Sequence, residues 1–132
     1  MAKPRGIRNN NPLNIRIGNT WLGEVPNPTD SDFEQFVSME YGLRAAFCIL
    51  RRYLRRYGRK TPSMIIKAWA PSSENDTQRY IDVVCRRSMI SPNEVLIYAD
   101  KDTMCRLVKA MAFVECGVDI DSSIIEKSYD MA

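Results

Sequence analysis

Apolar side chains recur at helical spacing along two long segments of the chain. One segment runs from Ser38 to Tyr57 and the other from Lys101 to Gly117. A period of about 3.6 residues is typical of a helix that packs one face against a core. The sequence therefore predicts two long amphipathic helices. Their apolar faces consist of Leu43, Ala46, Phe47, Leu50, Leu54 and Tyr57 in the first, and Met104, Leu107, Val108 and Met111 in the second.

Capping residues predict shorter helices between and after these two. Proline is favoured at the first helical position, and Ser, Thr and Asp accept hydrogen bonds from the first free N–H groups of a helix. The predicted starts are Thr61-Pro62, Asp76 or Thr77, the capping-box sequence Ser91-Pro92-Asn93-Glu94, and a last helix from about Ser122 to Tyr129.

The first 37 residues have a different pattern. Leu13, Ile15 and Ile17 alternate with Asn14 and Arg16, as in a half-buried strand, and a Gly-Asn pair at 18–19 then favours a tight turn. This pattern predicts a small β-hairpin. The predicted fold is mainly α (α+β), a single domain over residues 1–132 with a β-hairpin lobe and loop at 1–37 and a helical part at 38–132.

Composition narrows the classes of function. The 132 residues suit one domain, and no apolar run approaches the roughly 18 residues of a membrane span. The N-terminus has no apolar signal segment, so we expect a protein made in the cytoplasm without a signal peptide. The formal charge of +3 does not by itself imply nucleic acid. The outer side of the 38–57 helix is rich in arginine. Such a face is most often simply exposed to solvent, and nucleic-acid binding is the alternative explanation.

The chain contains no histidine, and its four cysteines are widely spaced without a CxxC pair. These features give little support to a metal site and remove the histidine-based catalytic triads. We expect no metal and no organic cofactor. Acid–base chemistry near neutral pH must then fall chiefly to carboxylates.

Glu115 is the carboxylate with the most distinctive setting. It continues the apolar stripe one turn beyond Met111, and Gly117 supplies the residue type that ends a helix. An apolar setting raises the pKa of a carboxyl group, which a general acid for glycoside cleavage requires. The alternative is that Glu115 turns outward at a fraying helix end.

Several motifs resemble those of a known family. The strings RGIRNNNPLNIR, Trp21-Leu22-Gly23, FEQFVSMEYGLRA and WAPSSENDTQRYI resemble small lysozyme-like proteins of phages and bacterial mobile elements, labelled virion structural or lytic proteins. The resemblance covers about residues 5 to 85, with Leu13 in place of the usual glycine of RNNNPGNIR.

The chain is also distantly similar to glucosaminidase-type cell-wall hydrolases of bacteria. In that family an acid-bearing helix ending in Glu-Ser-Gly precedes the asparagine-rich lobe. Here Glu115-Cys116-Gly117 follows that lobe near the other end of the chain, which suggests a circular permutation.

These resemblances imply a peptidoglycan-cleaving glycosidase, either a muramidase or glucosaminidase or a lytic transglycosylase, with Glu115 as general acid. The candidates for a second carboxylate are Glu24, Glu34 and Glu74. The residues expected to bind or support the glycan are Asn10, Asn11, Arg16, Trp21, Trp69, Asp76 and Tyr80.

The expected partners are glycan strands of peptidoglycan and other virion proteins. The protein would act at the cell wall after delivery by a virion, a holin or a secretion system. A non-catalytic virion or wall-binding protein is the alternative, with nucleic-acid binding as a further one. The glycosidic bond cleaved and the oligomeric state stay open.

Overall fold

A computed structural model describes residues 3–73 and 75–132 of the chain. Six helices occur within these residues, and they form a mainly α-helical fold. Their bounds are α1 (Arg5–Arg8), α2 (Met39–Arg55), α3 (Pro62–Trp69), α4 (Thr77–Ser88), α5 (Lys101–Cys116) and α6 (Ser122–Met131).

The capping residues begin the helices as the sequence predicts. The side chains of Ser38, Thr61 and Asp76 each accept a hydrogen bond from a backbone N–H in the first turn of α2, α3 and α4. The prediction that a short helix begins at the capping box 91–94 is wrong. There, the N–H of Glu94 bonds to the carbonyl of Ser91 in a single turn, and the chain then pairs with residue 60 instead of continuing as a helix.

The structure does not support the predicted β-hairpin. Arg16 pairs with Phe33 and Glu24 with Phe36, both as isolated antiparallel bridges. The pairing is set by Asn11, whose side-chain amide donates to the carbonyls of both Ile15 and Glu34. Residues 15–17 therefore lie against residues 32–34 rather than against 20–22, the segment that follows the Gly-Asn turn. The short helix α1, which the sequence pattern did not predict, lies near the start of this lobe.

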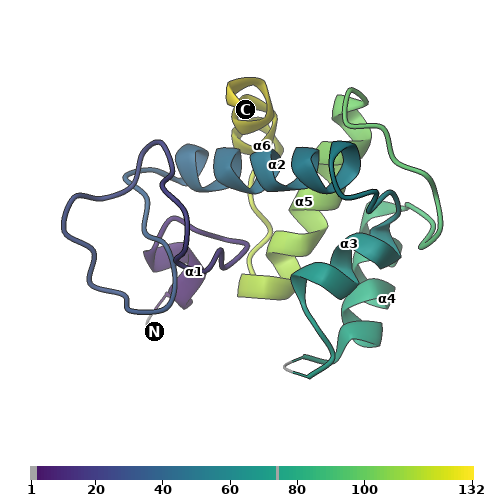
Figure 1. Ribbon diagram of the computed structural model, residues 1–132, viewed down its shortest axis with the longest axis horizontal. Coiled ribbons are helices and arrows are strands. Elements are labelled where there is room, and N and C mark those ends of the chain that lie inside the picture. The colour runs from purple at the N-terminus through teal and green to yellow at the C-terminus, as the bar shows by residue number, and fades with distance from the viewer. Residues whose placement is uncertain (1–2, 74) are drawn as a thin grey trace.

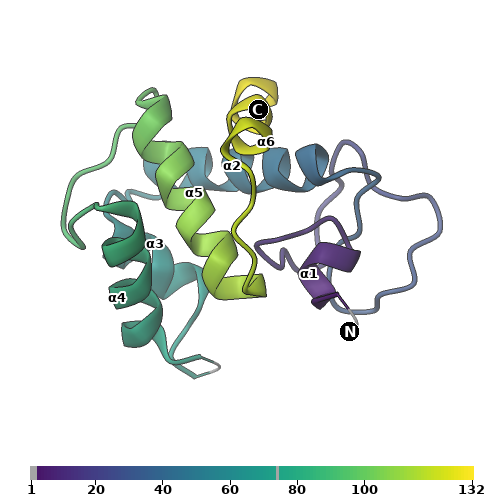
Figure 2. The ribbon, with the colours of Figure 1, turned by 180° about the vertical axis from the view of Figure 1, so that it is seen from behind.

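Helix α5 occupies the centre of the molecule, where it contacts α4, α6 and α1. In Figure 1, α2 crosses in front of α5, α3 and α4 lie to one side, and the N-terminal lobe lies to the other. Figure 2 shows the C-terminal end of α5 beside α1. The fold therefore brings the end of α5 to the border between the lobe and the helices. The largest fully buried side chains are Phe47, Leu13, Leu43, Leu50, Ile65, Ile66, Ile90, Met104, Leu107, Met111, Ile125 and Val84.

Candidate active site

Glu115 lies in the last turn of α5, and its side chain enters a small pocket. Gly117, with φ of 70°, ends the helix just beyond it. The pocket encloses about 220 Å³ at the border between the lobe and the helices. It is lined by Asn14, Arg16, Phe33, Trp69, Ala70, Asn75 and Glu115. The acid that sequence analysis selected therefore faces a cavity and not open solvent.

Both carboxylate oxygens of Glu115 accept hydrogen bonds from other parts of the chain. Asn14 Nδ2 donates to Oε1 at 3.0 Å, and the Tyr80 hydroxyl donates to Oε2 at 2.9 Å. The Trp69 indole N–H donates to the carbonyl of Leu13 at 3.1 Å, which ties the wall of the pocket formed by α3 to the lobe. These contacts hold the carboxyl group in one orientation.

The electrostatics of Glu115 combine two opposing effects. Burial raises the pKa of its carboxyl group, because desolvation disfavours the charged form, while Asn14, Tyr80 and the charge of Arg16 act in the lowering direction. The net shift in pKa is upward. Burial also raises the pKa of Tyr80 well above its ordinary value, with the Glu115 charge adding to this effect. Tyr80 therefore remains a protonated donor at neutral pH.

The residues around the pocket are positioned by local backbone chemistry. Asn14 adopts a left-handed conformation, with φ of 53°, which asparagine tolerates better than most residues. Thr77 begins α4 and donates its hydroxyl to the carbonyl of Ala70 at 2.6 Å, which closes the connection between α3 and α4. This connection joins α3, which carries Trp69 in the pocket lining, to α4, which carries Tyr80.

The predicted site residues divide into two groups. Arg16 and Trp69 line the pocket, and Tyr80 contacts the acid directly. Trp21 is buried beneath the Arg52 guanidinium and is absent from this lining. Asp76 caps α4 and faces a neighbouring pocket of about 320 Å³ that also contacts Tyr80.

Asn10 and Asn11 have structural contacts in the lobe. The side chain of Asn10 donates to the carbonyl of Phe36, and that of Asn11 is fully buried with backbone partners on two segments. Asn14 is the asparagine of this motif that reaches the acid. Its alternation with Leu13 and Ile15 was the signal that could have identified it, because the side chain of Asn14 leaves the core face. Phe33, Ala70 and Asn75 also line the pocket and were not among the predicted site residues.

Two of the candidate second carboxylates lie together outside this pocket. Glu34 is 7% exposed, and burial followed by contact with the carboxyl of Glu24 raises its pKa to about 7. Glu24 accepts a hydrogen bond from the backbone N–H of Trp21. The third candidate, Glu74, lies outside the described residues. Among the described residues, Glu115 is therefore the acid that lines the pocket.

Neither a metal cluster nor a membrane span is found in the part of the chain that the structure describes. No group of three or more potential Cys, Asp or Glu ligands is arranged to hold a metal ion there. None of the helices at 3–73 and 75–132 combines the length and apolar character needed to cross a bilayer.

The fold and the pocket define a mainly α-helical protein with a partly buried carboxyl group at the border between the N-terminal lobe and the helices. The chain is 40% identical over 117 residues to Protein P5 of Pseudoalteromonas phage PM2, an alignment that covers 86% of this chain and 71% of the phage protein. The chain belongs to the family of this phage protein. No known family profile matches it.

Proposed function

We propose that this protein is a peptidoglycan glycosidase in which Glu115 is the general acid. The observation that carries the proposal is the setting of Glu115, a partly buried carboxyl group with a raised pKa at the wall of a polar pocket. Glycoside cleavage requires such a group to protonate the leaving oxygen. The family relation to a phage protein agrees with a role in which a virion meets a cell wall.

In the proposed reaction, neutral Glu115 transfers its proton to the glycosidic oxygen as the bond breaks. The carboxylate that results is stabilised by the donors Asn14 and Tyr80, which already contact its two oxygens. These hydrogen bonds strengthen as negative charge develops, so they favour proton release in the transition state. The cation-like sugar is stabilised either by the acetamido group of the substrate or by a second carboxylate, and the predicted candidate Glu74 lies outside the described residues.

The lysozyme-like arrangement and its circular permutation form part of this proposal. Support comes from the contact between α5 and α1 and from the hydrogen bond between Asn14 and Glu115, which are 101 positions apart. In the similar hydrolases, the acid-bearing helix precedes the asparagine-rich lobe. Here α5 follows the lobe in sequence and packs against it, which is the geometry that a permutation requires.

The test is digestion of purified cell-wall sacculi, with released fragments separated by chromatography. We expect Glu115→Gln to reduce fragment release by at least about 100-fold, the usual scale for loss of a general acid. Glu126→Gln, an exposed position on α6, is the matched control and should retain activity. An inactive wild-type protein across a range of pH, or a fully active Glu115→Gln variant, would contradict the proposal.

A non-catalytic virion or wall-binding protein is the second candidate. It is favoured by the fact that both Glu115 oxygens are already satisfied by protein donors, as in a structural carboxylate. The digestion assay separates the two candidates, because a purely structural Glu115 predicts no fragment release by the wild-type protein. Under both candidates the Gln variant should be less stable, because the new amide N–H₂ meets the donors Asn14 or Tyr80. Chemical denaturation of wild type and variant measures this difference beside the digestion assay.

A further inference from the structure

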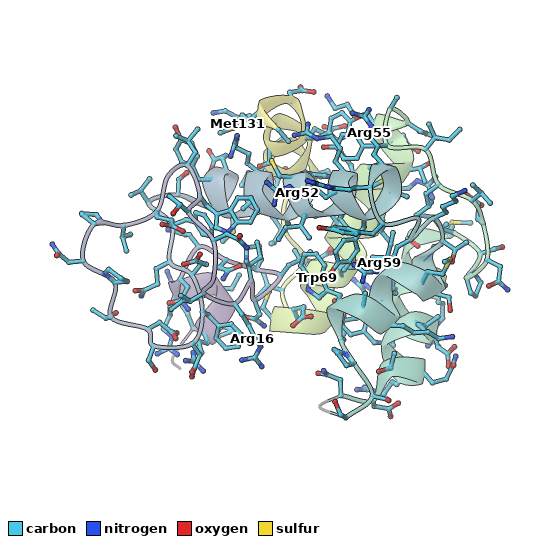
Figure 3. The ribbon with its side chains drawn as sticks, in the orientation of Figure 1. Arg16, Arg52, Arg55, Arg59, Trp69 and Met131 are labelled. Carbon is cyan, nitrogen blue, oxygen red and sulfur yellow. The ribbon has the colours of Figure 1, made fainter. Side chains whose placement is uncertain are left out.

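A dense group of cations lies on the C-terminal half of α2 and the turn after it. Residues 51–60 contain six cations and no acid: Arg51, Arg52, Arg55, Arg56, Arg59 and Lys60. In Figure 3, Arg59 and Trp69 lie below α2, Arg52 lies along the helix, and Arg55 lies above it. The group therefore has two sides, and one of them faces the region of the candidate active site.

Aromatic contacts connect the near side to the Glu115 pocket. Trp69, which lines the pocket, packs edge-on against Tyr53 with ring centroids 6.0 Å apart. The Arg59 guanidinium lies over the Tyr53 ring at 4.6 Å, and that of Arg52 lies over Trp21 at 5.4 Å. An unbroken series of contacts thus leads from the pocket through two aromatic rings to Arg59, while Arg52 precedes Tyr53 on the same helix.

Neither of these two arginines has an acidic partner in the part of the chain that the structure describes. Among the described residues, three other arginines do have acidic partners: Arg5 contacts Asp30, Arg87 contacts Asp119 and Arg106 contacts Asp102. A guanidinium stacked on a ring keeps its N–H edge available and loses little freedom when it binds an anion. Arg52 and Arg59 are therefore oriented for an external anion.

We infer that Arg52 and Arg59 form a subsite for the peptide carboxylates of a peptidoglycan strand whose sugars occupy the Glu115 pocket. This inference rests on the proposed function. Peptidoglycan carries short peptides on alternate sugars, and their free carboxylates match the fork of an arginine. A nucleic acid would use the entire arginine face, whereas a subsite beside the pocket depends on the near side alone.

The experiment measures binding without turnover, by pelleting the Glu115→Gln protein with insoluble sacculi. One batch of sacculi is untreated, and in the other the peptide carboxylates are converted to amides with carbodiimide and ammonia. We expect Arg52→Gln/Arg59→Gln to weaken binding to untreated sacculi about tenfold and to change binding to amidated sacculi less than twofold. Circular dichroism verifies that the variants fold.

The matched control is Arg51→Gln/Arg55→Gln on the same helix. Both of these guanidinia also lie over an aromatic ring, that of Tyr98, at 5.6 and 5.5 Å. We expect this variant to bind both batches as well as its parent. Equal losses in the two double variants, or equal losses on the two batches of sacculi, would overturn the subsite.

Mixed-sequence duplex DNA and vesicles containing anionic phospholipid serve as counter-probes. Tighter binding to either of these than to sacculi, lost equally in both double variants, would assign the arginine face to that partner and overturn the inference. The outcome is distinguishable from failure of the catalytic proposal. If sacculi are not cleaved but binding still depends on carboxylates and on Arg52 and Arg59, the result supports the peptide subsite and contradicts the role of Glu115 as general acid.

Discussion

The Tyr80 hydroxyl lies 2.9 Å from Oε2 of Glu115, although 35 positions of sequence separate the two residues. The contact joins α4 to the last turn of α5 and orients the carboxyl group toward the lobe. Because Tyr80 is itself buried, its pKa is raised and its hydroxyl stays a donor. The pKa of Glu115 therefore depends on the hydrogen bond from Tyr80.

Replacing Tyr80 with phenylalanine tests this coupling. The Tyr80 hydrogen bond acts to lower the pKa of Glu115, so its loss should raise that pKa further. The alkaline limb of the pH–activity profile on sacculi should move upward accordingly, with a lower maximal rate. Tyr57→Phe, at a position 57% exposed, is the control and should leave the profile unchanged.

The change in the pKa of Glu115 can also be measured directly, without an activity assay. In ¹³C-NMR titration of labelled glutamate, the Glu115 signal should titrate at higher pH in Tyr80→Phe than in wild type. A downward movement or no movement would show that the hydroxyl does not stabilise the carboxylate.

Asn11 predicts a large effect on stability. It is fully buried, and its side chain makes hydrogen bonds of 2.9, 3.0 and 2.9 Å with Ile15 O, Glu34 O and Ile15 N. Asn11→Ala leaves these backbone groups unpaired, and we expect the free energy of unfolding to fall by about 3 kcal/mol. Urea denaturation measures the change, with the exposed Asn19→Ala as control. A loss below about 1 kcal/mol would contradict the role given to Asn11.

A side chain at position 42 should cause a steric clash where α2 meets the lobe. A Cβ atom built at Gly42 would lie 1.7 Å from the carbonyl oxygen of Asn10, so one backbone must move. We expect Gly42→Ala to lower the free energy of unfolding by about 3 kcal/mol or to prevent folding. At Gly18 nothing lies within 4 Å of such an atom, and Gly18→Ala should change stability by less than about 1 kcal/mol. Similar stabilities of the two variants would refute the close approach.

Glu34 predicts a dependence of stability on pH. Its pKa rises from 4.5 to about 7 on folding, so between these values the folded state binds more protons than the unfolded state. The free energy of unfolding should therefore decrease as pH rises through this window, on the order of 2 kcal/mol in total. Glu34→Gln should flatten this slope, while Glu126→Gln should keep it. Denaturant titrations at pH 4, 5, 6, 7 and 8 give the comparison.

The sequence predicted most helices because their signals are local. Ser38, Thr61 and Asp76 cap helices through hydrogen bonds within a few residues, and the apolar stripes follow the helical period. The turn at 91–94 shows the limit of such signals. Residues 91–94 match the capping-box pattern. The N–H of Leu96, however, bonds to the carbonyl of Lys60, and that contact favours an extended chain over a helix.

By itself, the sequence determined the mainly α-helical fold, the placement of Glu115 on an apolar stripe and the stop at Gly117. Tertiary structure alone decided that Asn14 and Tyr80 contact this acid, that Glu34 is buried beside Glu24, and that residue 16 pairs with residue 33. The physical reason is the sequence separation of the residues that interact. Helix caps and periodicity act over a few positions, whereas the contact of Asn14 with Glu115 spans 101 positions and exists only once the lobe and α5 pack together.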